Sequence, residues 1–251
     1  MLERARLKDS AGAAGVEVDL LVVGIENSLW LAQQFCADLS RIFPRIRAVA
    51  LSSNIALGLL QSGPGQMNPY NFVYSPDNFR IGPNTMGLAV SHSGTTYPTV
   101  WAARFLRQRT QKVFSLSSSF DSLLSVSIGQ SPGQAFTRRL FSTMAGIRPA
   151  EAATAATVAM HHTLSHLLLH CAAQATSTRL PSLQDHTRFQ IVAGTAQERD
   201  PHVLASPTTT VPWCSATPDA VKDMQRVLLT LYWGVCSSCG VSANGKPVDA
   251  K

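Results

Sequence analysis

The sequence predicts an α/β fold in which helices cover both faces of a mostly parallel sheet. The prediction depends on a pattern that recurs through the first half of the chain: a short apolar run, a turn of small polar residues, and then a segment with apolar residues at helical spacing. Such alternation is typical of parallel strands, which need a crossover connection between them. The runs and their helices are 16–23 with 29–42, 46–51 with 52–60, 86–90 with 100–106, and 112–117 without a clear helix after it.

Composition indicates a globular protein with one sizeable core. Of the 251 residues 45% are hydrophobic and 14% are charged. The net charge of +6 comes from scattered arginines without interleaved aromatic residues, so we predict no nucleic-acid partner. The first ten residues lack the apolar region of a secretory signal, and the longest apolar windows are too short or too polar to span a bilayer. Together with dispersed cysteines, this predicts a cytoplasmic protein with no membrane partner.

The chain divides into three regions by pattern. Residues 1–15 are charged and then Ala/Gly-rich, which indicates a lead-in, and residues 16–178 form the predicted domain. The longest helical pattern, 149–175, closes this domain. Residues 179–251 form a C-terminal extension rich in Thr, Pro and Ser, with an amphipathic helix expected over 219–233.

The most informative stretch is 85–99, where an apolar run ends in the loop Ser-His-Ser-Gly-Thr-Thr and a helix then begins with a proline in its first turn. A strand, a hydroxyl-rich loop and a helix N-terminus together form an anion site, because backbone N–H groups and the helix dipole point toward the ligand. We expect Ser91, His92, Ser93 and Thr96 to bind a phosphate group. The loop is not a Walker loop, since no Gly-Lys-Ser/Thr follows it.

The string from Ser91 to Thr96 resembles the Ser-x-Ser-Gly-x-Thr signature of the sugar isomerase (SIS) domain family. This family includes phosphosugar isomerases and the isomerase half of glutamine–fructose-6-phosphate transaminases. The resemblance implies a three-layer αβα sandwich with a mostly parallel five-stranded sheet. It places a short helix at 121–124 and the last strand near 140–142. It also implies a small-molecule sugar phosphate as ligand and a homo-oligomer. We predict no cofactor.

A second turn, Gly24-Ile25-Glu26-Asn27-Ser28, follows the first predicted strand. In the resembled family this turn runs Gly-x-Gly-Ser/Thr-Ser and faces the sugar phosphate. Here Glu26 stands where the second glycine would be. A carboxylate that pointed inward there would repel a phosphate, but it could also contact sugar hydroxyls or act as a base. We expect Asn27, Ser28 and Ser117 to surround the sugar.

Aldose–ketose isomerisation needs a base that carries a proton between adjacent carbons and a group that assists ring opening. Glu151 and His162 are the residues we assign to these roles. Glu151 also suits the first turn of a helix for electrostatic reasons alone. The sequence therefore leaves open whether the chain isomerises a sugar phosphate or only binds one. The alternative is a catalytically degenerate SIS module that acts as a regulatory or scaffolding subunit through protein contacts.

Two further patterns carry metal-ligating residue types. His162, His166 and His170 are spaced i, i+4 and i+8 on one helix face, where two histidines could hold a transition metal. No Asp or Glu lies near them as a third ligand, and we predict a polar helix face and no metal site. The pair Cys236 and Cys239 has C-x-x-C spacing without a second ligand pair, and we interpret it as structural.

Overall fold

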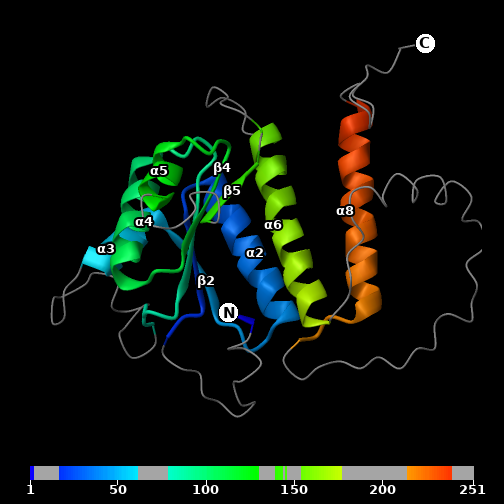
Figure 1. Cartoon of the computed structure of the whole chain (residues 1–251), viewed down its shortest axis with the longest axis horizontal. Coiled ribbons are helices and arrows are strands. Elements are labelled where there is room, and N and C mark those ends of the chain that lie inside the picture. Colours follow the sequence, from blue (N-terminus) through cyan, green and yellow to red (C-terminus); the bar gives the residue numbers. More distant parts are fainter. Residues whose placement is uncertain are drawn as a thin grey trace, which may run out of the picture. The chain divides into compact units, whose positions relative to one another are not determined.

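The computed structural model describes residues 1–2, 17–61, 79–129, 139–143, 145, 154–176 and 214–238 (Figure 1). The chain divides into two compact units, Met1–Leu168 and Leu169–Lys251. The predicted lead-in lies almost entirely outside the described residues. The domain boundaries expected at residues 15 and 178 stay predictions.

Five parallel strands form one sheet in the first unit. Its strand order is β2-β1-β3-β4-β5, and every neighbouring pair is parallel. This confirms the predicted α/β fold with a five-stranded sheet. The strands are β1 (Leu20–Gly24), β2 (Ala48–Ser52), β3 (Met86–Val90), β4 (Val113–Ser117) and β5 (Leu140–Ser142).

Helices cover both faces of this sheet. Helix α2 (Asn27–Ile42) packs against β1 and β2, whereas α3 (Ser53–Gln61), α4 (Tyr97–Arg109) and α5 (Leu123–Gly129) pack side by side on the other face (Figure 1). Three layers result, as the sequence predicts. The short helix expected at 121–124 is longer and begins two residues later, because the serine-rich turn after β4 extends to Ser122.

Two long helices follow the sheet: α6 (Thr154–Ala175) and α8 (Pro218–Ser238). Helix α6 crosses the division between the two compact units. Both correspond to helices that the sequence predicts, with α8 five residues longer at its C-terminal end than expected. No helix in the described parts of the chain combines the length and the apolar character that crossing a bilayer requires.

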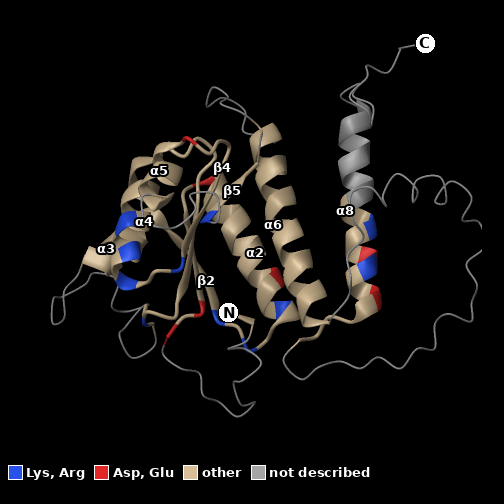
Figure 2. Cartoon of the chain, in the orientation of Figure 1, with Lys and Arg blue, Asp and Glu red and all other residues tan. Residues whose placement is uncertain are grey.

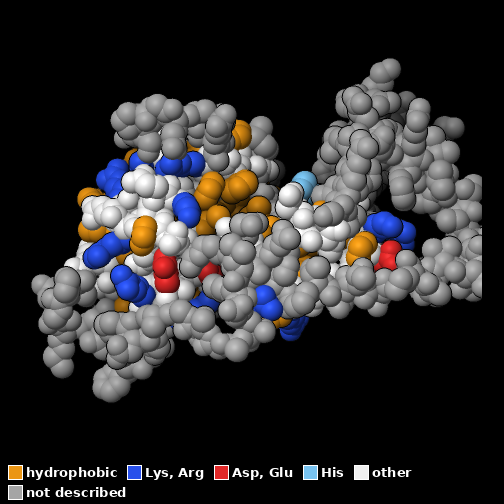
Figure 3. Space-filling model, turned by 60° about the horizontal axis from the view of Figure 1, so that its bottom comes forward, with side chains coloured by type: hydrophobic (Ala, Val, Ile, Leu, Met, Phe, Trp, Pro, Cys, Tyr) orange, Lys and Arg blue, Asp and Glu red, His pale blue; other side chains and the backbone are white. Residues whose placement is uncertain are grey.

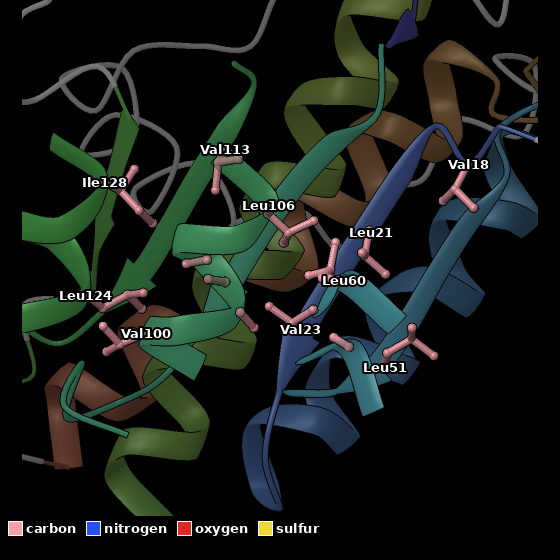
Figure 4. Packing of buried hydrophobic residues seen from close by; sticks show 14 of the residues in the cluster. Val18, Leu21, Val23, Leu51, Leu60, Val100, Leu106, Val113, Leu124 and Ile128 are labelled. Atoms are coloured by element: carbon pink, nitrogen blue, oxygen red, sulfur yellow. The ribbon is translucent and has the colours of Figure 1, made fainter. Parts of the chain in front are cut away.

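The hydrophobic core lies between the sheet and the layer formed by α3, α4 and α5 (Figure 4). Leu21 and Val23 of β1 are fully buried and pack with Leu106 of α4 and Leu124 of α5. All five residues of β1 are buried because this strand is covered on both faces. Burying such aliphatic side chains stabilises the fold by about 1.5–3 kcal/mol each.

Arginine side chains of α4 make contacts with neighbouring groups of the fold. This helix carries three arginines and no acidic residue (Figure 2). Arg107 donates a hydrogen bond to the Ser127 carbonyl at 2.7 Å, and the Arg104 guanidinium lies 5.0 Å from the centroid of the Trp101 ring. On the face drawn in Figure 3, basic side chains lie at several separate places. The sequence analysis likewise describes the arginines as scattered. The absence of a nucleic-acid partner stays a prediction.

Candidate functional site

The two predicted ligand-binding turns lie at the same edge of the sheet. Strand β1 is followed by α2 on one face, and its neighbour β3 is followed by α4 on the other face. The carboxyl ends of β1 and β3 therefore mark the point where the chain connections diverge to opposite faces. In open α/β sheets, ligands bind outside the carboxyl ends of the strands at such a point.

Ser91 gives the loop after β3 its shape. Its side chain is buried, with 2% of the residue exposed. Its hydroxyl accepts a hydrogen bond from the backbone N–H of Gly94 at 3.2 Å and lies 2.9 Å from the hydroxyl of Thr96. Ser91 thus joins the middle and the end of the loop, a position that suits a structural role within the predicted phosphate site.

The hydroxyl groups that reach the surface of the loop belong to Ser93 and Thr95, while Thr96 is half-buried. The Ser93 hydroxyl accepts hydrogen bonds from the Thr95 backbone N–H at 3.2 Å and from the Thr95 hydroxyl at 3.0 Å. Sequence reasoning missed Thr95, which occupies the variable position of the signature. The sequence shows several small hydroxyl residues close together in this loop, and Thr95 is one of them.

The N-terminus of α4 faces this loop without a side-chain cap. Thr96 is the N-cap residue, but its side chain makes no capping hydrogen bond to the helix. Its hydroxyl is instead engaged with Ser91. Pro98, in the first turn, has no N–H to donate. The first backbone N–H groups of a helix have no intrahelical partner and carry the positive end of its dipole, so this terminus suits an anion.

Gly94 fixes the path of the loop. Its φ of 64° lies in the left-handed region, and its backbone carbonyl accepts a hydrogen bond from Leu124 N–H at 2.8 Å. The carbonyl of His92 likewise accepts one from Ser118 N–H at 2.9 Å. These two bonds hold the loop against the turn that joins β4 to α5.

Ser117 belongs to a buried cluster of serines beneath that turn. Its hydroxyl donates to the Ser119 carbonyl at 2.8 Å and lies 3.1 Å from the Ser122 hydroxyl and 3.0 Å from that of Ser125. Only 1% of Ser117 is exposed. The predicted role of Ser117 beside the sugar stays a prediction. Its contacts join it to the turn between β4 and α5, which holds the loop after β3.

The turn after β1 contains a residue in a conformation that favours glycine. Glu26 has φ 51° and ψ −122°, and it is the one non-glycine residue with positive φ in the described part of the chain. This is the position where the resembled family has its second glycine. Holding a glutamate in this conformation costs about 1–3 kcal/mol. The Glu26 side chain is exposed, while Asn27 is half-buried and Ser28 is buried.

The two predicted catalytic residues are not joined by any described contact. Glu151 lies outside the described residues. His162 lies on α6, where burial first and the charge of His161 second lower its pKa. Its Nε2 atom lies 3.0 Å from Nε2 of His166. In the described residues, no group of three or more His, Cys, Asp or Glu side chains could hold a metal ion. Cys239 and the side chain of Cys236 also lie outside the description.

No family model matches this sequence, and a comparison with curated proteins finds no match. Several solved structures are similar. The C-terminal domain of glucosamine-fructose-6-phosphate aminotransferase from Francisella tularensis aligns with a TM-score of 0.46 and 13% identity over 77% of this chain and 45% of that one. A candidate sugar-phosphate isomerase from Listeria monocytogenes aligns with a TM-score of 0.45 and 13% identity over 76% and 84% of the two chains.

A candidate phosphosugar isomerase involved in capsule formation in Bacteroides fragilis aligns with a TM-score of 0.45 and 15% identity, over 74% of this chain and 90% of that one. The architecture of this chain is defined by its own sheet and loops. Five parallel strands lie between two helix layers, with the Ser-x-Ser-Gly-x-Thr loop after β3, and this is the three-layer α/β fold that the sequence predicts.

Proposed function

We propose that this chain binds a phosphorylated sugar at the carboxyl edge of the sheet, between β1 and β3. The observation that carries the proposal is the N-terminus of α4, which has no side-chain cap and faces a loop with surface hydroxyl groups. A phosphate there would accept hydrogen bonds from Ser93, Thr95 and backbone N–H groups of the first helical turn. Such charge-assisted hydrogen bonds are stronger than neutral ones.

The residues of the loop after β3 fall into two groups: those exposed for direct contact with a phosphate and those that hold the loop in its conformation. Ser93 and Thr95 are exposed and suit direct contact, whereas Ser91 is buried and acts through the hydroxyl of Thr96. The turn after β1 provides Asn27 and Ser28 for the sugar, because β1 is the neighbour of β3. The resemblance of the loop to the SIS signature favours a sugar phosphate over other phosphorylated ligands.

Isomerisation is a separate step that needs a base near the sugar. Of the turns after β1 and after β3, the turn after β1 carries a carboxylate, that of Glu26. Its side chain is exposed. Glu151 and His162 remain the residues proposed for proton transfer. Binding is the function that the geometry supports best, and catalysis depends on whether one of these groups reaches the substrate.

Thermal unfolding against a panel of hexose, hexosamine and pentose phosphates tests the binding proposal. A ligand at about 100 times its dissociation constant adds roughly 2.7 kcal/mol to the free energy of unfolding. The stabilisation should require the phosphate, so the unphosphorylated sugar should give no shift. If no sugar phosphate shifts the melting temperature, the chain is better explained as a scaffolding module.

Two serine substitutions separate contact from support. Ser93→Ala should weaken sugar-phosphate binding by about tenfold or more, because it removes one charge-assisted hydrogen bond worth about 1.5–3 kcal/mol. Its effect on stability without ligand should stay within about 0.5 kcal/mol, because the residue is exposed. Ser91→Ala should instead lower the free energy of unfolding by about 1–2 kcal/mol, because the loop loses two hydrogen bonds. Ser40→Ala, near the far end of α2, is the matched control and should change neither quantity. Unchanged binding in Ser93→Ala would place the phosphate elsewhere.

A further inference from the structure

His162 and His166 lie one helical turn apart on α6 and direct their rings at each other. Their Nε2 atoms are 3.0 Å apart, their ring centroids are 4.4 Å apart, and the ring planes are inclined at 76°. Residues spaced i and i+4 are neighbours on a helix surface, so the helix backbone holds the two rings in this relationship. Both side chains are half-buried, which leaves part of each ring open to solvent.

We propose that His162 and His166 form a binding site for a divalent transition-metal ion, with the two Nε2 atoms as ligands. Imidazole nitrogen is a good ligand for Zn²⁺, Cu²⁺ and Ni²⁺. Two ligands in adjacent turns of one helix need no other part of the fold to bring them together. In the ion-free chain a hydrogen bond joins the two Nε2 atoms, so the ring that donates it must carry its proton on Nδ1 before both Nε2 atoms can bind an ion.

The separation of the two nitrogens is compatible with their binding one ion. Two metal–nitrogen bonds of about 2.05 Å that end on atoms 3.0 Å apart enclose an angle of about 90°. An angle near 90° is the one between neighbouring ligands in square-planar or octahedral coordination, which Cu²⁺ and Ni²⁺ adopt. Tetrahedral Zn²⁺ would require the nitrogens to move apart by a few tenths of an ångström, to about 3.3 Å. A slight rotation of either ring gives this separation, so the pair suits all three ions.

The site is an open one. In the described residues, no third His, Cys, Asp or Glu side chain joins the pair to form a metal-binding group. Positions of the ion that no residue of the chain fills would take water or a small oxygen or nitrogen ligand from solution. Open positions distinguish metal sites that exchange ligands from closed structural sites. We accordingly expect an exchangeable ion bound by this pair, not one on which the fold depends.

Titration of the full-length, metal-free protein with Ni²⁺ at neutral pH tests the site, with calorimetry for stoichiometry and affinity. Ni²⁺ is preferred as the probe because Cu²⁺ also oxidises thiols, and the chain contains five cysteines. We expect one ion per chain. His162→Ala and His166→Ala should each weaken binding by about tenfold or more, because either change removes one of two ligands.

The same helix offers matched controls. His161 and His170 are exposed and lie on α6 within four residues of the pair. His161→Ala and His170→Ala should leave the Ni²⁺ affinity within about twofold of that of the unmodified chain. Circular dichroism of each variant checks that α6 remains folded. Stoichiometric Ni²⁺ binding that survives in the His162→Ala/His166→Ala double variant would overturn the proposal, and so would an unmodified chain that binds no Ni²⁺. Sugar-phosphate binding is measured separately and does not enter this outcome.

Discussion

Gly94 and Ser122 lie so close together that position 94 has no room for a side chain. A β-carbon built on Gly94 would lie 2.3 Å from both Cβ and Oγ of Ser122. The backbone of Gly94 also has φ 64°, which side-chain-bearing residues rarely adopt. Glycine is therefore required at position 94 for two reasons. The backbone conformation favours it, and the β4–α5 turn leaves no room for a β-carbon.

Gly94→Ala should lower the free energy of unfolding by about 2–5 kcal/mol. The left-handed backbone contributes about 1–2 kcal/mol of this cost and the overpacking against Ser122 about 1–3 kcal/mol. Urea unfolding measures the change. Ser122→Gly alone also loses hydrogen bonds to Ser117 and Ser125, so it serves as the reference: in that background Gly94→Ala should cost only the part due to φ.

Gly87→Ala in β3 is the control for this substitution. A β-carbon there would meet Leu106 Cδ1 at 3.4 Å and Val113 Cγ2 at 3.5 Å, which is close to ordinary contact distance. Its cost should stay below about 1 kcal/mol. Equal costs for Gly94→Ala and Gly87→Ala would contradict the interpretation of the signature glycine.

The sequence predicts the sheet well because its strands are short apolar runs followed by polar turns. The run that ends at Val23 becomes strand β1, and the Ser-x-Ser-Gly-x-Thr string becomes the loop at the N-terminus of α4. The pattern could not predict which hydroxyl groups of the loop are exposed for a ligand and which form hydrogen bonds within the protein. The Ser91 hydroxyl turns toward Gly94 and Thr96 within the loop. The loop itself is held by hydrogen bonds from Ser118 and Leu124, which are distant in sequence.

The histidine pair shows a different limit of sequence reasoning. Spacing places His162, His166 and His170 on one helix face, but it does not say which rings turn toward each other. Rotamers and burial decide that, and in the structure His162 and His166 are half-buried while His170 is exposed. At Glu26 the departure from the family pattern raised only the question of the carboxylate's charge, and it did not predict the positive φ that the structure has there.

Glu26→Gly should stabilise the protein by about 1 kcal/mol. Glycine relieves the strain of φ 51° and ψ −122°, worth about 1–3 kcal/mol, and gives back part of the gain because it loses more backbone entropy on folding. Glu26→Ala removes the same charge but keeps the strain, so it should change stability by less than about 0.5 kcal/mol. The difference between the two variants in urea unfolding isolates the backbone contribution. A lower stability for Glu26→Gly than for Glu26→Ala would mean that the turn holds Glu26 without strain.

The thiol of Cys36 should be unreactive in the folded protein. Burial raises its pKa to about 12, and 6% of the residue is exposed on α2. The thiolate is the nucleophile, so iodoacetamide at pH 8 should modify Cys36 slowly in the native chain and rapidly in urea, as mass spectrometry of the peptides can measure. The same shift links stability to pH. Because the folded pKa lies above the unfolded value near 9, the contribution of Cys36 is fully present below pH 9 and is lost as pH rises from 9 toward 12. Cys36→Ala should flatten this alkaline loss of stability, and an unchanged slope would show that another group causes it.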